Sequence, residues 1–185
     1  MAADAPVVRW LLQYGGLVTT LRSPRLQLQP ASSAHRNALA QMNASPTVGP
    51  DAQSRIDAIL QYSQLWFAEH GFGLWIISAM DADEPLGWVG LRPGEDPAKP
   101  ELLYGLAPSA QGHGYATEAS ATILNWLFAQ ERFAGAWAAT VRSNPASVRV
   151  LERLRMRCVG SEELDGVNSL VYRITKPEWI AAEAM

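Results

Sequence analysis

The most informative segment of the chain is a glycine-rich turn at residues 111–119, which reads QGHGYATEA. The flanking pattern predicts that this turn follows a strand and opens a helix. The first N–H groups of a helix lack internal partners, and the helix dipole places partial positive charge beside them. Gly112 and Gly114 let the backbone approach a bulky anion and adopt conformations closed to other residues. The segment therefore predicts a nest of backbone amides that binds phosphate.

Three classes of cofactor are bound by such a turn. A dinucleotide-binding fingerprint needs a glycine where Thr117 stands, and no acidic residue follows at the expected distance. A P-loop needs the sequence Gly-Lys-Ser/Thr, which is absent here. Coenzyme A is the remaining class. Because a glycine before a helix is common, the spacing alone also leaves an ordinary helix start as an interpretation.

The elements that must position this turn alternate between helical and strand patterns. Helices are expected from Ser32 or Ser33 to about Asn43, from Asp51 to a stop at Gly71, at residues 115–130, and from Asn144 to about Leu154. Strand patterns occupy residues 25–29, 72–80, 86–91, 101–106, 136–141, 157–164 and 169–175. The mixed order predicts an α+β fold in one domain, with a mixed, mostly antiparallel sheet of about seven strands and about four helices.

Composition bounds the kind of protein. The 185 residues suit one domain at residues 17–185, with residues 1–16 as an N-terminal extension. No apolar run approaches the roughly 18 residues of a membrane span, and the N-terminus does not resemble a secretory signal. The single cysteine, Cys158, excludes an internal disulfide and argues against a cysteine-based metal site. We therefore expect a cytoplasmic protein with no metal and no membrane partner.

The net charge of −3 argues against a general nucleic-acid binder, which usually carries a basic surplus. A local basic cluster nevertheless exists, at Arg149, Arg153, Arg155 and Arg157. These side chains are interpreted either as phosphate ligands or, more simply, as a solvated helix face.

The turn closely resembles the acetyl-CoA signature of the GNAT superfamily, Gln/Arg-x-x-Gly-x-Gly/Ala, at Gln111, Gly114 and Ala116. Other segments resemble the RimJ/RimL-like branch, which acetylates ribosomal-protein N-termini. They are SPRLQL at 23–28, HGFGLW at 70–75, LGWVGL at 86–91, ELLYGLAP at 101–108, NPAS at 144–147 and VLERL at 150–154. The resemblance runs in order from about Leu17 to Lys176. It implies a GNAT-like fold and transfer of an acetyl group from acetyl-CoA to a primary amine, within a ternary complex.

The resemblance also implies a set of cofactor-binding residues. The end of the strand at 101–106 lies beside the pantetheine arm, backbone amides of the turn hold the pyrophosphate, and two polar side chains reach the cofactor from the other side. In this sequence the residues are Leu106, Ala107, Pro108, Gln111, Gly112, His113, Gly114, Tyr115, Ala116, Thr117, Asn144 and Ser147.

The reaction requires deprotonation of the amine, stabilisation of an oxyanion and protonation of the leaving thiolate. The resemblance makes Glu101 the candidate base and Ser147 the candidate acid toward the thiolate. The simpler interpretations are a solvated residue at a strand start and a polar residue in a first helical turn. Asn144 serves as a helix N-cap in either case.

Two residues depart from the family pattern. Many members have a tyrosine as general acid where this chain has Leu151, so that chemistry is absent there. The helix end that commonly contains glycine has Arg155 instead, which puts the geometry of this turn in doubt. His113 is interpreted as a variable, solvent-facing residue rather than a catalytic one.

The acceptor amine is not identified by the sequence. A protein N-terminus and a small-molecule amine both fit, and residues 44–50 and 92–100 are expected to form loops around it. Trp66 and Trp75 are candidates for an acceptor pocket, with an aromatic core as the alternative. A non-catalytic acyl-CoA-binding module and another acyl donor, such as succinyl-CoA, are the competing functions. The expected state is a monomer or a homodimer.

Overall fold

The computed structural model describes residues 20–42, 52–164 and 166–183. The N-terminal extension at 1–16, the loop at 44–50 and the helix ends expected at Asn43 and Asp51 lie outside the described residues. The strands are β1 (Leu21–Arg22), β2 (Leu26–Pro30), β3 (Leu74–Ala79), β4 (Pro85–Arg92), β5 (Glu101–Leu106), β6 (Gly135–Val141), β7 (Arg157–Leu164) and β8 (Val167–Thr175). The α-helices are α2 (Arg36–Met42), α3 (Ala52–His70), α4 (Tyr115–Phe128), α5 (Pro145–Arg153) and α6 (Lys176–Glu183).

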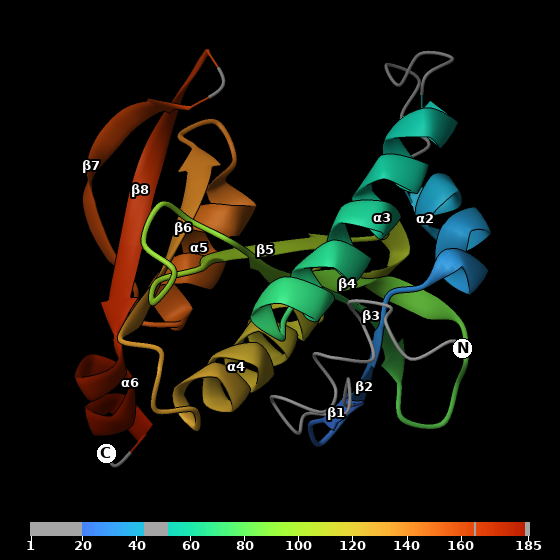
Figure 1. The fold of residues 1–185 in the computed structure, drawn as a ribbon, viewed down its shortest axis with the longest axis horizontal. Coiled ribbons are helices and arrows are strands. Elements are labelled where there is room, and N and C mark those ends of the chain that lie inside the picture. Colours follow the sequence, from blue (N-terminus) through green and yellow to red (C-terminus); the bar gives the residue numbers. More distant parts are fainter. Residues whose placement is uncertain (1–19, 43–51, 165, 184–185) are drawn as a thin grey trace, which may run out of the picture.

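All eight described strands join one sheet in the order β1-β2-β3-β4-β5-β6-β8-β7 (Figure 1). Every neighbouring pair is antiparallel except β5 and β6, which are parallel. The predicted α+β fold with a mixed, mostly antiparallel sheet is therefore confirmed. The structure adds one strand and one helix to the predicted seven and four.

The two added elements are short and carry weak periodicity. Strand β1 has only two residues, too few for an alternating pattern to register. Helix α6 begins with a capping box, in which the Glu178 carboxylate accepts from the Thr175 N–H at 2.8 Å. Trp179 fixes α6 to the core, because its indole N–H donates to Asn125 of α4 at 2.7 Å. The Thr-x-x-Glu spacing was a readable signal for this helix.

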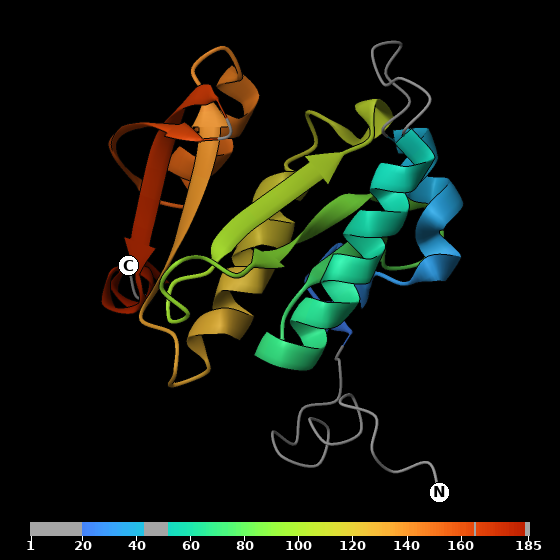
Figure 2. The ribbon, with the colours of Figure 1, turned by 45° about the horizontal axis from the view of Figure 1, so that its top comes forward.

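Helices cover both faces of the central strands (Figure 2). On one face, Trp75, Val89 and Leu102 pack in the same cluster as Ile123 and Leu127 of α4. On the other face, Leu74, Ile76 and Trp88 pack with residues of α2 and α3. Successive strand residues point to opposite faces, so the two sets alternate along the strands.

Helix α3 is buried at Ile56, Leu60 and Phe67, and at the polar Ser63. The Ser63 hydroxyl accepts the Leu74 N–H at 2.9 Å, which satisfies a polar group inside the core. Ile59, in contrast, is 42% exposed. The predicted stop is confirmed at Gly71, which has φ 75°.

The end of α5 resolves the doubt raised by Arg155. Arg155 adopts φ 58°, the left-handed conformation that glycine has in this position of a Schellman motif. Its N–H donates to the Glu152 carbonyl at 2.9 Å, and the Met156 N–H donates to the Leu151 carbonyl at 3.0 Å. Both Leu151 and Met156 are buried in the same core cluster, where this motif commonly has apolar residues.

Strands β5 and β6 separate soon after they meet. Their one paired position is Glu101 with Trp137, at the first residue of β5. Figures 1 and 2 show the two strands running apart from there, with β6 joining β8 and β7 in a separate arm. The rest of β5 therefore has backbone groups on one edge that no ladder with β6 satisfies, within the described residues.

Candidate functional site

The glycine-rich turn has the backbone of an anion-binding nest. Gly112 has φ 81° and Gly114 has φ 80°, both in the left-handed region. Gly114 is the N-cap of α4, so the turn ends where the free N–H groups of that helix begin. A Cβ at Gly112 would meet no atom within 4 Å. The space beside Gly112 is therefore open, as approach of a bulky phosphate group requires, and both glycines line a pocket.

An ion pair braces the turn from the side of β2. The Glu118 carboxylate, in the first turn of α4, accepts from the Ser23 hydroxyl at 2.7 Å and from the Arg25 N–H at 2.9 Å. The Arg25 guanidinium pairs with Glu118 at 2.6 Å and donates to the His113 carbonyl at 3.1 Å. It also lies over the Tyr115 ring, 4.9 Å from its centroid. These contacts tie both ends of the turn to the edge of the sheet.

The pKa of Glu118 is below its ordinary value. Burial alone would raise this pKa, but the hydrogen bonds from Ser23 and Arg25 and the charge of Arg25 outweigh it. The carboxylate is therefore ionised at neutral pH, where it also interacts favourably with the positive end of α4.

A pocket of about 370 Å³ opens beside the turn. Three elements form its wall: the end of β5, the turn with the start of α4, and one face of α5. The lining residues are Tyr104, Gly105, Leu106, Gln111, Gly112, Gly114, Ala116, Thr117, Asn144, Ala146, Ser147, Arg149, Val150 and Arg153.

Eight of the twelve residues predicted to bind a cofactor line this pocket. The other four lie outside the wall: Ala107 and Pro108 directly follow β5, whereas His113 and Tyr115 belong to the turn. The His113 ring stacks on Tyr115 with centroids 5.5 Å apart, and its Nδ1 lies 2.8 Å from the Gln111 carbonyl. His113 thus contacts the turn itself.

Asn144 and Ser147 form a closed unit at the start of α5. The Asn144 side chain accepts the Ser147 N–H at 3.2 Å, and its amide donates to the Ser147 hydroxyl oxygen at 3.1 Å. The expected N-cap is therefore present. Because an amide NH₂ only donates, the Ser147 oxygen acts as acceptor and its own hydrogen is left to donate elsewhere.

Tyr104 joins the two diverging arms. Its hydroxyl donates to the Ser147 carbonyl at 3.2 Å, from β5 to α5. Burial raises the pKa of Tyr104, more than its bond to Ser147 lowers it, so the phenol keeps its proton at neutral pH. Sequence reasoning named this residue only within a family segment and gave it no role.

One polar atom in the pocket wall indicates that the pocket fits a polar ligand. The Thr117 hydroxyl is buried and has no hydrogen-bond partner among the described residues, as is also true of Ser120. Thr117 lines the pocket, whereas Ser120 does not. A buried hydroxyl normally has a hydrogen-bond partner, so a polar ligand group in the pocket would supply the partner that the Thr117 hydroxyl lacks. The open nest and this hydroxyl fit a diphosphate.

Glu101 lies at the apex where β5 and β6 meet, outside the pocket wall. Its side chain is only 3% exposed and pairs with Arg92 directly across β4. The interpretation of Glu101 as a solvated strand start is therefore wrong. By strand alternation, Glu101 points to the face covered by α2 and α3, opposite the face of Tyr104.

The two tryptophans proposed for an acceptor pocket differ in burial. Trp75 is 1% exposed, and its ring packs edge-on against Phe67 and Trp126. This burial favours the aromatic-core alternative for Trp75. Trp66 is half-buried beside the α2–α3 cluster and stacks with the exposed Tyr62 at 6.1 Å. Trp66 thus keeps a surface on the same face as Glu101.

Comparison with known proteins defines the family. A family model described as the acetyltransferase (GNAT) domain matches residues 25–157. This match covers well over half of the chain, so the chain belongs to the GNAT acetyltransferase family and is an acyltransferase by class. Within the described residues, no helix combines the length and the apolar character needed to cross a membrane.

Solved structures share the fold. An acetyltransferase from Agrobacterium tumefaciens is 26% identical, with a TM-score of 0.73 over 86% of this chain and 95% of that one. A protein from Bordetella pertussis assigned to the GNAT acetyltransferases is 23% identical, with a TM-score of 0.74 over 84% and 98%. RimL, the ribosomal L7/L12 alpha-N-protein acetyltransferase solved with coenzyme A, is 17% identical, with a TM-score of 0.71 over 85% and 98%.

Proposed function

We propose that the chain is an acetyl-CoA-dependent N-acetyltransferase that acts on a primary amine. The observation that carries the proposal is one pocket that combines an open phosphate nest, the unpaired edge of β5 and the Asn144–Ser147 unit. A diphosphate, an extended amide-containing arm and a thioester need those three features in that order. The family supplies the acetyl donor as the default.

In this proposal the backbone amides of residues 112–117 hold the diphosphate, with the Thr117 hydroxyl as an added donor. The free edge of β5 pairs with the amide groups of the pantetheine arm, as another strand would. Arg25 and Glu118 keep the turn in place while the ligand enters and leaves.

Glu101 and Ser147 divide the proton transfers between them. Glu101, on the face of α2 and α3, accepts the amine proton through water as the amine approaches the opening between β5 and β6. Ser147, whose hydrogen is free to donate, passes its proton to the leaving thiolate from the α5 side and takes a proton from pocket water in the same step. The amine and the cofactor thus approach from opposite faces of the sheet. Because neither blocks the other, both can be bound when the reaction takes place.

A thiol-release assay tests this function. Purified protein with acetyl-CoA is screened against small amines, lysine-containing peptides and peptides with free N-termini, and coenzyme A release is followed with a thiol reagent. An α-amine has a pKa of about 8 and a lysine side chain about 10.4, so at pH 7 α-amines need less help from the base. We expect amine-dependent release, faster with α-amines. Acetyl-CoA binding without release for any amine would indicate a non-catalytic module instead.

A further inference from the structure

We propose that Arg149 and Arg153 form a second anion site, which binds the phosphate monoester at the 3′ position of the adenosine part of coenzyme A. This inference rests on the proposed function, because it adds a subsite to the same pocket. The chemistry that the two side chains recognise is a dianionic phosphate, separate from the diphosphate held by the nest.

The first observation is position. Arg149 and Arg153 are four residues apart on α5, so they lie on one face of the helix, about 6 Å apart along its axis. Both line the pocket that contains the nest. Along α5 the pocket wall runs from Asn144 and Ser147, through Arg149, to Arg153. The two guanidinium groups therefore extend the pocket away from the Ser147 end.

The second observation is that the charges are not used within the protein. Among the described residues, no carboxylate lies within ion-pair distance of Arg149 or Arg153, whereas Arg157 pairs with Glu178 at 2.7 Å. Arg155 and Arg157 also lie outside the pocket wall. The basic cluster seen in the sequence thus divides into two residues that face the pocket and two that do not.

The third observation concerns the phosphate monoester, which is the anionic part of the ligand that the nest does not bind. The nest supplies backbone amides, and its N–H groups are used by the diphosphate. A phosphate monoester carries a charge of about −1.5 to −2 at pH 7, which two guanidinium groups would neutralise. In a chain of net charge −3, this local positive potential also attracts an anionic ligand to the correct end of the pocket. A solvated helix face explains the exposure of these arginines but not their place in the pocket wall.

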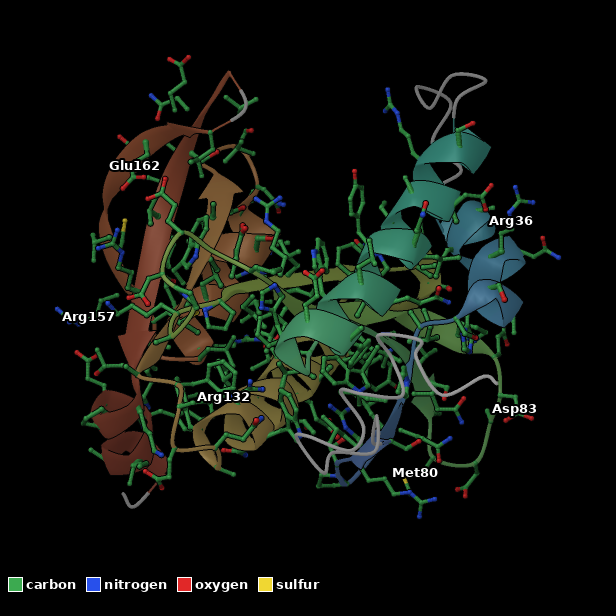
Figure 3. All side chains as sticks on the ribbon, viewed as in Figure 1. Arg36, Met80, Asp83, Arg132, Arg157 and Glu162 are labelled. Carbon is green, nitrogen blue, oxygen red and sulfur yellow. The ribbon has the colours of Figure 1, made fainter. Side chains whose placement is uncertain are left out.

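Calorimetry with coenzyme A and 3′-dephospho-coenzyme A tests the subsite. Wild-type protein is expected to bind coenzyme A about tenfold to a hundredfold more tightly, the value of charge-assisted contacts to one phosphate. The double variant Arg149→Gln, Arg153→Gln is expected to bind both ligands equally, with the affinity for dephospho-coenzyme A unchanged. The control Arg157→Gln removes one guanidinium charge, half of what the double variant removes, from the outer β7 edge (Figure 3) and is expected to keep the wild-type preference.

Each result is decisive. Equal affinities of the wild type for the two ligands would overturn the subsite while leaving the proposed function intact. A double variant that keeps the full preference would overturn the assignment to these arginines. Failure of the wild type to bind either ligand would overturn the proposed function together with the subsite. Competition by inorganic phosphate distinguishes a general phosphate site, because displacement of dephospho-coenzyme A as easily as coenzyme A would contradict binding at the 3′ position.

Discussion

Asn144 shows how one side chain serves a helix and a ligand site at once. It caps α5 by accepting the Ser147 N–H, and the same amide orients the Ser147 hydroxyl. An N-cap contributes about 1 kcal/mol to helix stability, which alone accounts for an asparagine before Pro145. Its second contact places a hydroxyl with a free hydrogen on the pocket wall. The two interpretations left open by the sequence are therefore compatible.

The role proposed for Glu101 gives a kinetic prediction. Glu101→Gln is expected to lower kcat by about a hundredfold near pH 7, because general-base assistance is lost. The loss is expected to be largest at low pH and to shrink as pH rises, because the amine then loses its proton unaided. Affinity for acetyl-CoA, measured by calorimetry, is expected to stay constant, since Glu101 lies outside the pocket wall.

A control variant distinguishes the loss of the base from the loss of its ion pair. Arg92→Gln removes the partner of Glu101 across β4 but keeps the carboxylate. This variant is expected to retain a pH-dependent rate with an acidic limb. An unchanged pH–rate profile in Glu101→Gln would exclude Glu101 as the base.

Arg155 gives a stability prediction that is independent of function. A non-glycine residue in the left-handed conformation costs about 1–2 kcal/mol, and glycine loses about 0.5–1 kcal/mol through backbone entropy. Arg155→Gly is therefore expected to stabilise the protein by about 0.5–1 kcal/mol in urea unfolding. Arg155→Ala keeps the strained φ of 58° and is expected to give no such gain. Destabilisation by the glycine substitution would show that the Arg155 side chain has a packing role.

At the scale of elements, β5 explains most of the site. Its first residue is paired on both sides, to Arg92 of β4 and to Trp137 of β6. Beyond that point only β4 continues the ladder, and Tyr104 alone spans from β5 to α5 by a hydrogen bond among those described. Strand β5 is thus paired on both sides at Glu101, whereas its edge near the nest is not paired with β6.

The brace between β2 and α4 predicts a pH effect on stability. The pKa of Glu118 is lowered from 4.5 in the folded protein, so its stabilising contacts are fully present above about pH 4.5 and are lost as the pH falls below it. At pH 7, Glu118→Gln is expected to be less stable than wild type by about 1–2 kcal/mol in urea unfolding, because hydrogen bonds to a charged group are weakened.

The same comparison at pH 3 is expected to show a smaller difference, because the stabilising effect of the Glu118 charge is progressively lost as the pH falls below about 4.5. Glu131→Gln is a suitable control, because the Glu131 side chain is 98% exposed and is expected to contribute little at either pH. A constant difference between wild type and Glu118→Gln at both pH values would mean that the charge of Glu118 does not support the turn.

At the scale of the whole molecule, the sequence predicted most elements and the position of the nest. Gly112, Gly114 and Asn144 were readable because local backbone geometry requires those residue types. The contacts of Tyr104 with Ser147 and of Arg25 with Glu118 were not readable, since they join residues far apart in the chain. The burial of Glu101 was missed for the same reason: a strand pattern does not show which residue lies at the apex of two diverging strands.

In the whole molecule, the pocket and the candidate base lie on different faces of the sheet. The pocket with the nest lies between β5, α4 and α5, whereas Glu101 and Trp66 lie on the face of α2 and α3. The proposed transfer requires access from both faces, but it depends first on the nest, because without a bound donor neither Glu101 nor Ser147 has a reaction to assist.

Binding of coenzyme A to a variant with a filled nest tests this central claim most directly. Gly114→Trp places a large ring at the N-cap of α4, and Gly166→Trp is the matched control. Gly166 has φ 77°, close to the 80° of Gly114; a Cβ at Gly166 would meet no atom within 4 Å, whereas a Cβ at Gly114 would lie 3.6 Å from Nη2 of Arg25, an ordinary van der Waals contact. Both substitutions therefore impose the same backbone strain. We predict that calorimetry will show no coenzyme A binding to Gly114→Trp and wild-type affinity for Gly166→Trp. Undiminished binding by a folded Gly114→Trp protein would contradict the account.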